Sequence, residues 1–305
     1  MLKIIDSHSH CIPLEVAQKT AFFKVGWSDA DKQLAAMDEQ GIARSLLLYP
    51  TSDAHIQMGG WKNLAEAYNA GIAKIVKQHS DRFIGAGILA IDNEKNLSES
   101  LKQFSDYGFP VISLASSYEG KYLDEGIFFA VYEYAAAKKI PIHIHPQIMN
   151  PIGEDRVRDP LLSPVLEYVF DVSMCIGKLM MSGTFLKFPS VKFIFAHYGG
   201  VLPLVKERFD NTYLMLRKRE FVKDLGKVPS EYLKNIYFDT SGSKSLASLL
   251  CALEVTDASH ILWGSDHPAN QNTKASIDAI LASQISSSDK EKILSQNILS
   301  LLSRS

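Results

Sequence analysis

The sequence predicts an α/β protein built as a TIM (β/α)8 barrel. Short, nearly continuous apolar runs alternate with helical patterns along the 305-residue chain, and such runs are typical of parallel strands covered on both faces. The strand candidates number eight. No glycine-rich phosphate loop follows the first of them, which disfavours an open nucleotide-binding sheet. We therefore expect a single barrel domain over residues 1–305.

The strand candidates are short stretches rich in β-branched and aromatic residues, which favour extended structure. In chain order they are Lys3–Ile5, Ser45–Tyr49, Phe83–Leu89, Val111–Leu114, Pro141–His145, Val191–Phe195, Ile236–Phe238 and Ile261–Trp263.

Helical patterns fill the intervals between the strands. The first, Ser28–Gln40, begins at a serine that we expect to cap it and ends before Gly41, a residue type common just past helix ends. The others are Trp61–His79, Asn96–Tyr107, Glu125–Lys138, Leu166–Met181, Leu202–Arg219, Ser243–Leu253, Thr273–Leu281 and Ser288–Leu302.

The connection after the fifth strand, Pro146 to Ser190, is the longest in the chain. Several prolines precede its helix, and the alternating charges of Glu154–Asp159 indicate a solvated loop. Because βα loops form the catalytic face of a barrel, we expect this loop-helix insertion to shape the substrate pocket.

Charge and cysteine usage exclude several classes of function. The formal net charge of -2 gives no electrostatic reason to expect nucleic acid or an anionic membrane as a partner. Cys11, Cys175 and Cys251 are too few and too scattered for a disulfide framework. The polar start of the chain and the lack of a long uncharged apolar stretch predict neither a signal peptide nor a membrane span. We expect a cytoplasmic protein.

Histidine and aspartate gather where the strand candidates end. His8 and His10 follow the first strand, and residues two apart on a strand share a face, so both imidazoles can reach one ion. A lone strand histidine is more often a packing residue, and a bare His-x-His pair is a weak motif. His145, His197 and Asp266 end three further strands. Their combination predicts a metal site at the barrel mouth.

The segments that carry these residues resemble the amidohydrolase-related family. Within it they resemble the branch that contains aminocarboxymuconate-semialdehyde decarboxylase and related aromatic-acid decarboxylases. The resemblance covers essentially the whole chain, and the matching segments are Asp6–His10, His145-Pro146, Gly183–Lys192, Ala196–Gly200, Trp263–Pro268 and Gln296–Leu299.

The resemblance implies a role for each residue of the site. His8, His10, His145 and Asp266 would hold one divalent cation, with Zn2+ expected and Mn2+ as the alternative. His197, which is not a ligand, and Asp266 would be catalytic.

The resemblance also implies a role for Arg208. In related decarboxylases the matching arginine reaches a substrate carboxylate across a subunit interface, which implies a homodimer or a higher homo-oligomer. The planar guanidinium fork suits a carboxylate.

Two departures from family patterns narrow the number of metal ions and the substrates that the sequence predicts. Binuclear members use a carboxylated lysine after the fourth strand, whereas Ala115–Tyr118 contains none and the next lysine is Lys121. This favours one metal ion. The muconate enzyme also carries arginines just before the position of Met37, where this chain has Lys32–Ala36. This disfavours the dicarboxylate substrate of that enzyme but not its scaffold.

Other polar residues at the strand ends have two interpretations each. His143 shares a face with His145 and is either a substrate contact or a support in the core. His267 faces away from its neighbour in the chain and is a weaker substrate candidate. Asp6 and Asp239 are each either a hydrogen-bond partner of a ligand imidazole or a purely structural residue.

Aromatic residues occupy the first two βα loops. Trp27 is the substrate-binding candidate among them, and together with Phe22, Phe23 and Trp61 it would give an apolar pocket for a planar substrate. Packing of the loops against the barrel is the alternative.

Two reactions fit this site, and the fold does not choose between them. The first is non-oxidative decarboxylation of a small unsaturated or aromatic carboxylic acid, which the branch resemblance and Arg208 favour. The second is hydrolysis of a lactone or amide by metal-activated water. A non-catalytic barrel would be expected to have lost a ligand, and all four are present.

Overall fold

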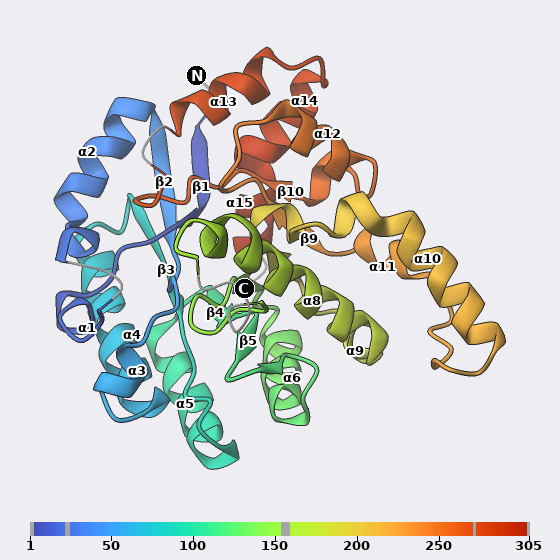
Figure 1. Cartoon of the computed structure of the whole chain (residues 1–305). Helices are drawn as coiled ribbons and strands as arrows, with labels where there is room; N and C mark the ends of the chain where they lie inside the picture. The colour runs from blue at the N-terminus through green and yellow to red at the C-terminus, as the bar shows by residue number, and fades with distance from the viewer. Residues whose placement is uncertain (1–2, 22–24, 154–158, 271–272, 304–305) are drawn as a thin grey trace.

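The computed structural model describes residues 3–21, 25–153, 159–270 and 273–303. Within them, eight parallel strands form one sheet in the order β1-β2-β3-β4-β7-β8-β9-β10. Helices surround this sheet (Figure 1), and the arrangement is the TIM barrel that the sequence predicts. Phe22, Phe23 and most of the charged run Glu154–Asp159 lie outside the described residues.

All the strand candidates are confirmed, with shifted ends. The barrel strands are β1 (Ile4–Ser9), β2 (Ile42–Leu47), β3 (Phe83–Gly87), β4 (Val111–Ala115), β7 (Ile142–His145), β8 (Phe193–Phe195), β9 (Tyr237–Asp239) and β10 (Ile261–Leu262). A small antiparallel hairpin, β5 (Ser117–Tyr118) and β6 (Lys121–Tyr122), follows β4.

The sheet closes between its first and last strands. Ser7 N donates to Trp263 O at 2.9 Å and Ser265 N donates to His8 O at 3.1 Å, while Ser9 forms an isolated parallel bridge with His267. These bonds bring the ends of β1 and β10 together, so their polar residues meet at one mouth.

The longer helices match the sequence prediction. The helices of the described chain are α1 (Leu14–Ala17), α2 (Ala30–Gln40), α3 (Ala54–Gln57), α4 (Trp61–Gln78), α5 (Glu94–Tyr107), α6 (Phe129–Lys138), α8 (Tyr168–Met181), α9 (Thr184–Lys187), α10 (Leu202–Lys218), α11 (Pro229–Leu233), α12 (Leu246–Leu253), α13 (Lys274–Ala282), α14 (Ser287–Glu291) and α15 (Asn297–Leu302). None of those described is long and apolar enough to cross a membrane.

The expected cap of the first predicted helix is wrong. Ser28 belongs to the short 3-10 helix η1 (Val25–Ser28), and Asp29 caps α2 by accepting Lys32 N at 2.9 Å. Serine and aspartate are both good caps, so the sequence allowed either.

The long insertion follows β7 as expected. It contains the π-helical turn η3 (Ser163–Glu167), then α8 and α9. Asp171 on α8 anchors this segment to the loop after β4, since its carboxylate accepts hydrogen bonds from Ser116 Oγ and Ser117 Oγ.

Apolar residues divide into a layer outside the barrel and a cluster inside it. The outer layer includes Phe193 and Phe195, which alternate with the inward-facing Ile194. The inner cluster combines strand residues with two from α15, which lies against β1 and β10. It comprises Ile5, Leu46, Leu48, Ile84, Ala86, Val111, Ile194, Tyr237, Leu262, Ile298 and Leu301.

Glycine in β3 allows an aromatic pair to pack directly on the strand. A Cβ atom added at Gly87 would lie 2.5 Å from a ring carbon of Phe109 and 2.6 Å from one of Phe104. We predict that Gly87→Ala lowers the free energy of unfolding by about 1–3 kcal/mol, because the two buried rings must shift. Urea denaturation measures this.

Gly177 in α8 is the matched control. A Cβ there would have no atom within 4 Å, so Gly177→Ala should leave stability unchanged or raise it by up to about 1 kcal/mol. Equal stabilities for the two variants would contradict the close packing at Gly87.

Candidate metal centre and active site

Three imidazoles at the barrel mouth are each held by their Nδ1 atom. His8 Nδ1 lies 2.8 Å from Asp239 Oδ2, His10 Nδ1 3.1 Å from Leu48 O, and His145 Nδ1 2.9 Å from Pro146 O. An ionised carboxylate and a carbonyl oxygen only accept hydrogen bonds, so each Nδ1 carries the proton. In the neutral imidazole each Nε2 therefore keeps a free lone pair.

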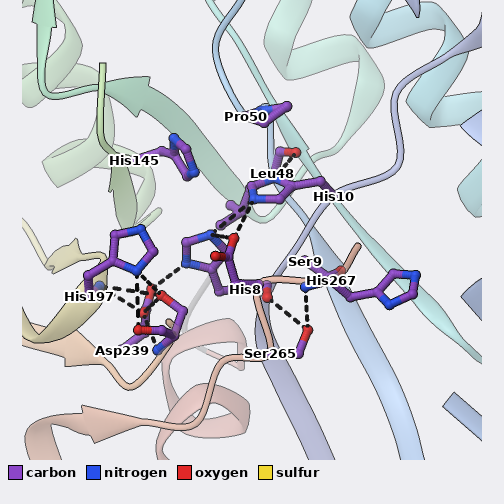
Figure 2. Close-up of polar contacts among 12 residues, drawn as sticks. His8, Ser9, His10, Leu48, Pro50, His145, His197, Asp239, Ser265 and His267 are labelled. Carbon is purple, nitrogen blue, oxygen red and sulfur yellow. Dashed lines mark hydrogen bonds and ion pairs between the residues drawn. The ribbon is translucent and has the colours of Figure 1, made fainter. Parts of the chain in front are cut away.

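These lone pairs converge (Figure 2). His8 Nε2 and His10 Nε2 are 3.1 Å apart, and Asp266 Oδ1 lies 3.5 and 3.2 Å from them. His145 completes a set of ligand atoms that all lie within 4.8 Å of one another. Atoms that share an ion at 2.0–2.2 Å are separated by roughly 2.8–3.6 Å. Two facing lone pairs without a proton repel, and a cation between them removes that repulsion, so the donor set fits a divalent metal ion.

The protonation states of these groups also suit a cation. Burial lowers the pKa of His8 to about 4. Burial and the neighbouring imidazoles hold the pKa of His145 well below its ordinary value. Burial opposes ionisation of Asp266, but its contacts with His10, His8 and His197 outweigh this, and its pKa is lowered. At neutral pH His8 and His145 are therefore neutral imidazoles and Asp266 is a carboxylate, as metal binding requires.

Asp239 at the end of β9 holds the Nδ1 side of the candidate ligand His8. Its Oδ2 atom contacts His8 Nδ1 and also lies 2.9 Å from His143 Nε2. Burial opposes its ionisation, but the contacts with His8 and His143 hold the pKa of this carboxyl well below its usual range. Of the two roles open to it, Asp239 therefore takes that of partner to a ligand imidazole.

His143 lies beneath the ligands rather than at the cavity. Its side chain is fully buried, and it is not among the residues that line the cavity described below. This placement gives no support to a substrate contact, and it matches the alternative of a supporting residue in the core. His8, His143 and Asp239 also lie close enough to hold an ion, but their short contacts are those of a buried polar network.

Asp6 has the structural role. Its Oδ1 atom accepts His8 N at 3.0 Å and Ser265 N at 2.9 Å, and its Oδ2 atom accepts the hydroxyls of Ser45 and Ser265 at 2.8 and 2.6 Å. It thus joins β1 to β2 and to the segment after β10. Burial raises the pKa of Asp6 to about 6, and these hydrogen bonds offset part of the effect.

His197 is held beside the ligands by the loop after β9. Its Nδ1 atom lies 3.1 Å from Ser241 O and 2.9 Å from Ser241 Oγ, and Ser241 Oγ in turn donates to Asp239 Oδ1. The backbone of His197 and of Tyr198 is in the left-handed region, with φ of 53° and 58°. Such conformations cost about 1 kcal/mol or more and are typical of functional sites.

The site opens into a cavity of about 1420 Å3. His10, His145, His197 and Asp266 line it, and so do apolar residues of the insertion. Trp27 lines it as well and stacks on the His10 ring, with a centroid separation of 5.9 Å.

Trp61 and His267, two further candidates for substrate contact, lie away from the ligand cluster. Trp61 is buried and stacks on His55 at 4.3 Å, so packing explains it. The side chain of His267 points away from the ligand cluster (Figure 2). Arg208 is exposed on α10 and is not among the residues that line the cavity of its own chain.

The family model for amidohydrolases matches residues 5–304. The chain belongs to the amidohydrolase family. The segments singled out from the sequence therefore lie within a region that this family shares.

Relatives of this amidohydrolase include characterised enzymes. A 2-amino-3-carboxymuconate-6-semialdehyde decarboxylase from Dictyostelium discoideum is 26% identical over 319 residues, which covers 98% of this chain and 84% of that protein. The structure of 5-carboxyvanillate decarboxylase from Sphingomonas paucimobilis matches with a TM-score of 0.88 at 22% identity, covering 99% of each chain. Dihydroxybenzoic acid decarboxylase from Polaromonas sp. JS666, solved with bound manganese and 2-nitroresorcinol, matches with a TM-score of 0.80 at 23% identity, covering 99% and 97%.

Ser241 is a residue of the candidate site that the sequence analysis missed. The signal was present, because Ser241 lies two residues beyond Asp239 at the end of a barrel strand and can share its face. Its partner His197 comes from the neighbouring β8, however, and that contact appears only in the folded chain.

We predict that the purified protein holds one divalent ion and that His145→Ala loses it, because one of the four ligands is removed. Asp239→Asn should keep the fold and weaken metal binding by roughly 10–100-fold, since it weakens the support of His8. Competition with a fluorescent chelator measures the affinity.

His267→Ala is the control for this experiment, as it removes a nearby imidazole that points away from the cluster. It should retain the full metal content. Equal metal retention by His145→Ala and His267→Ala would contradict the assignment of the ligands.

Proposed function

We propose that this amidohydrolase is a metal-dependent, non-oxidative decarboxylase of a small aromatic or unsaturated carboxylic acid. The observation that carries the proposal is that three residues of the ligand cluster, the non-ligand His197 and the ring of Trp27 border one cavity. Decarboxylases that are related over nearly the whole chain support it.

His8, His10, His145 and Asp266 would hold a divalent ion, which when bound would supply Lewis-acid polarisation of a substrate oxygen. Three imidazoles and one carboxylate suit Zn2+, which we propose as the resident metal. Mn2+ is the alternative, because a structural relative was solved with it.

Decarboxylation exchanges a carboxylate for a proton at the same carbon. The C–C bond breaks, CO2 leaves, and the electron pair forms the new C–H bond. We propose that His197 and Asp266 transfer this proton to the substrate carbon. Ser241 binds His197 Nδ1, which leaves Nε2 as the atom that accepts or delivers a proton in the cavity.

The cavity walls suit a planar substrate. The Trp27 ring stacks on the His10 ring with an interplanar angle of 26°. Ile148, Met149 and Pro151 add apolar surface from the insertion. A flat, conjugated acid buries both faces against such groups while its carboxylate reaches the cation site.

The first test is a screen of metal-loaded protein against aromatic acids, muconates and lactones, with CO2 release and acid release measured separately. We expect CO2 release from at least one acid. His197→Ala should retain the metal and lose turnover by a factor of about 100 or more, as for loss of a general acid or base.

His143→Gln serves as the comparison, since His143 lies outside the cavity and should affect turnover less than His197. Acid release from a lactone without CO2 release from any acid would replace the decarboxylase by the hydrolase. Full turnover by His197→Ala would remove that residue from the mechanism.

We also propose that the chain acts as a homodimer in which Arg208 reaches the partner's site. Large apolar side chains are exposed on η3, α8, α10 and α12, and two of them, Val165 and Leu204, line the cavity. Exposed apolar side chains in such number are typical of an interface between protein chains. Leu204 on α10, one turn before Arg208, is 75% exposed and lines the cavity rim. Others on η3, α8, α10 and α12 are Val165, Leu166, Phe170, Met174, Val205, Leu214, Met215, Leu246 and Leu250.

Analytical ultracentrifugation should give a dimer. Arg208→Ala should weaken binding of carboxylate substrates at unchanged metal content. A mixture of Arg208→Ala and His197→Ala chains, refolded together, should recover activity, since one site of each mixed dimer is intact. The recovery should approach about a quarter of wild type for a twofold dimer.

Arg219→Ala, which alters an arginine beyond the end of α10, should leave substrate binding unchanged. A monomer, or mixed chains with no more activity than either variant alone, would rule out the role of Arg208 in trans.

A further inference from the structure

We infer that Lys244 forms an anion subsite in the reaction cavity, so that the preferred substrate carries a second negative group besides the carboxylate that reacts. The inference rests on the proposed function for the identity of the reacting group. Among the described residues that line the cavity, Lys244 is the sole lysine or arginine. The other cavity-lining groups that can become cationic are His10, His145 and His197, which are committed to the metal centre and to proton transfer.

The loop after β9 fixes the position of Lys244. Asp239 Oδ1 accepts Ser241 N at 2.9 Å, and Ser243 Oγ accepts Ser245 N at 3.1 Å. Lys244 lies between these two anchored points and three residues after Ser241, the residue that binds His197. The backbone that carries the ammonium group therefore belongs to the same wall as His197.

Gly242 brings this loop directly against the His197 ring. Its φ is +73°, and a Cβ atom there would lie 3.0 Å from His197 Nδ1. The left-handed conformation and the close approach both favour glycine. They place the backbone of Lys244 next to the His197 side chain.

The ammonium group of Lys244 is available to a ligand. The side chain is exposed, and it forms no ion pair with any residue in the described part of the chain. Lys62, Lys178 and Lys274, by contrast, pair with Glu99, Asp124 and Asp278. A flexible stem allows the charge to meet an anion at several positions in the cavity.

The cavity has walls of different chemistry. The insertion contributes mainly apolar residues, among them Ile148, Met149 and Pro151, together with Asp159 and Ser163. The loop after β9 and the start of α12 contribute Lys244 and the hydroxyls of Ser243 and Ser248. A planar ring can rest on the apolar wall with one carboxylate at the cation site. A second carboxylate or phenolate on that ring would then face Lys244. This deepens the proposed substrate class from an aromatic acid to a dianionic one.

Binding of simple aromatic carboxylates tests the inference. Dissociation constants of benzoate, isophthalate and terephthalate for the metal-loaded protein can be measured by isothermal titration calorimetry at low salt. At least one dicarboxylate should bind about tenfold more tightly than benzoate, beyond the roughly twofold advantage of two equal carboxylates, as expected for one charge-assisted contact. Added salt should reduce the preference.

In Lys244→Met the preference should fall to about twofold or less, and in Lys244→Arg most of it should persist, because the charge remains. Lys274→Met is the matched control, since that lysine pairs with Asp278 on α13 outside the cavity, and it should keep the full preference. An unchanged preference in Lys244→Met would overturn the subsite and make Lys244 an ordinary solvated lysine.

The outcome is separable from that of the proposed function. A Lys244-dependent preference for dicarboxylates without CO2 release from any acid would overturn the decarboxylase and leave the anion subsite standing. CO2 release together with an unchanged preference in Lys244→Met would overturn the anion subsite and leave the decarboxylase standing.

Discussion

The mouth of this barrel depends on hydrogen bonds that fix the tautomers of three imidazoles. His8, His10 and His145 each use Nδ1 to bind an oxygen, so each turns Nε2 toward the same point. Two of the three acceptors are backbone carbonyls, Leu48 O just beyond β2 and Pro146 O just beyond β7. The barrel backbone therefore orients two of the three rings directly, and such preorganisation reduces the free-energy cost of binding a cation.

One carboxylate connects the candidate metal ligand His8 with His197, the residue proposed to transfer the proton. Asp239 contacts His8 through Oδ2 and Ser241 through Oδ1, and Ser241 binds His197. The backbone N–H of His197 also donates to Asp239 Oδ1, at 3.1 Å. A change at Asp239 would thus disturb the ligand His8 and the catalytic candidate His197 together. Its complete burial and its unusually low pKa are consistent with this central place.

Stability and chemistry are divided along the barrel axis. Apolar side chains fill the interior at the α15 end, where Ile298 and Leu301 join the strand residues. The opposite end carries polar residues and left-handed backbone at His197, Tyr198 and Asp266. Such strain persists only where the surroundings enforce it. Here the closed barrel and its hydrogen bonds to Asp6 and Asp239 do so.

The sequence by itself determined the fold class, the strands and the residues at their ends. Apolar runs and helical periods are local patterns, and the spacing of His8 and His10 already implies a shared face. What only the tertiary structure decided are the roles of residues whose partners are distant in the chain. Asp6 and Asp239 looked alike as strand-end aspartates, yet one ties strands together and the other supports a ligand. Only the folded chain places Ser241 and Lys244 together in the wall of the cavity. The reason is that barrel closure brings strand ends together from across the whole chain, and no local pattern records which side chains then meet.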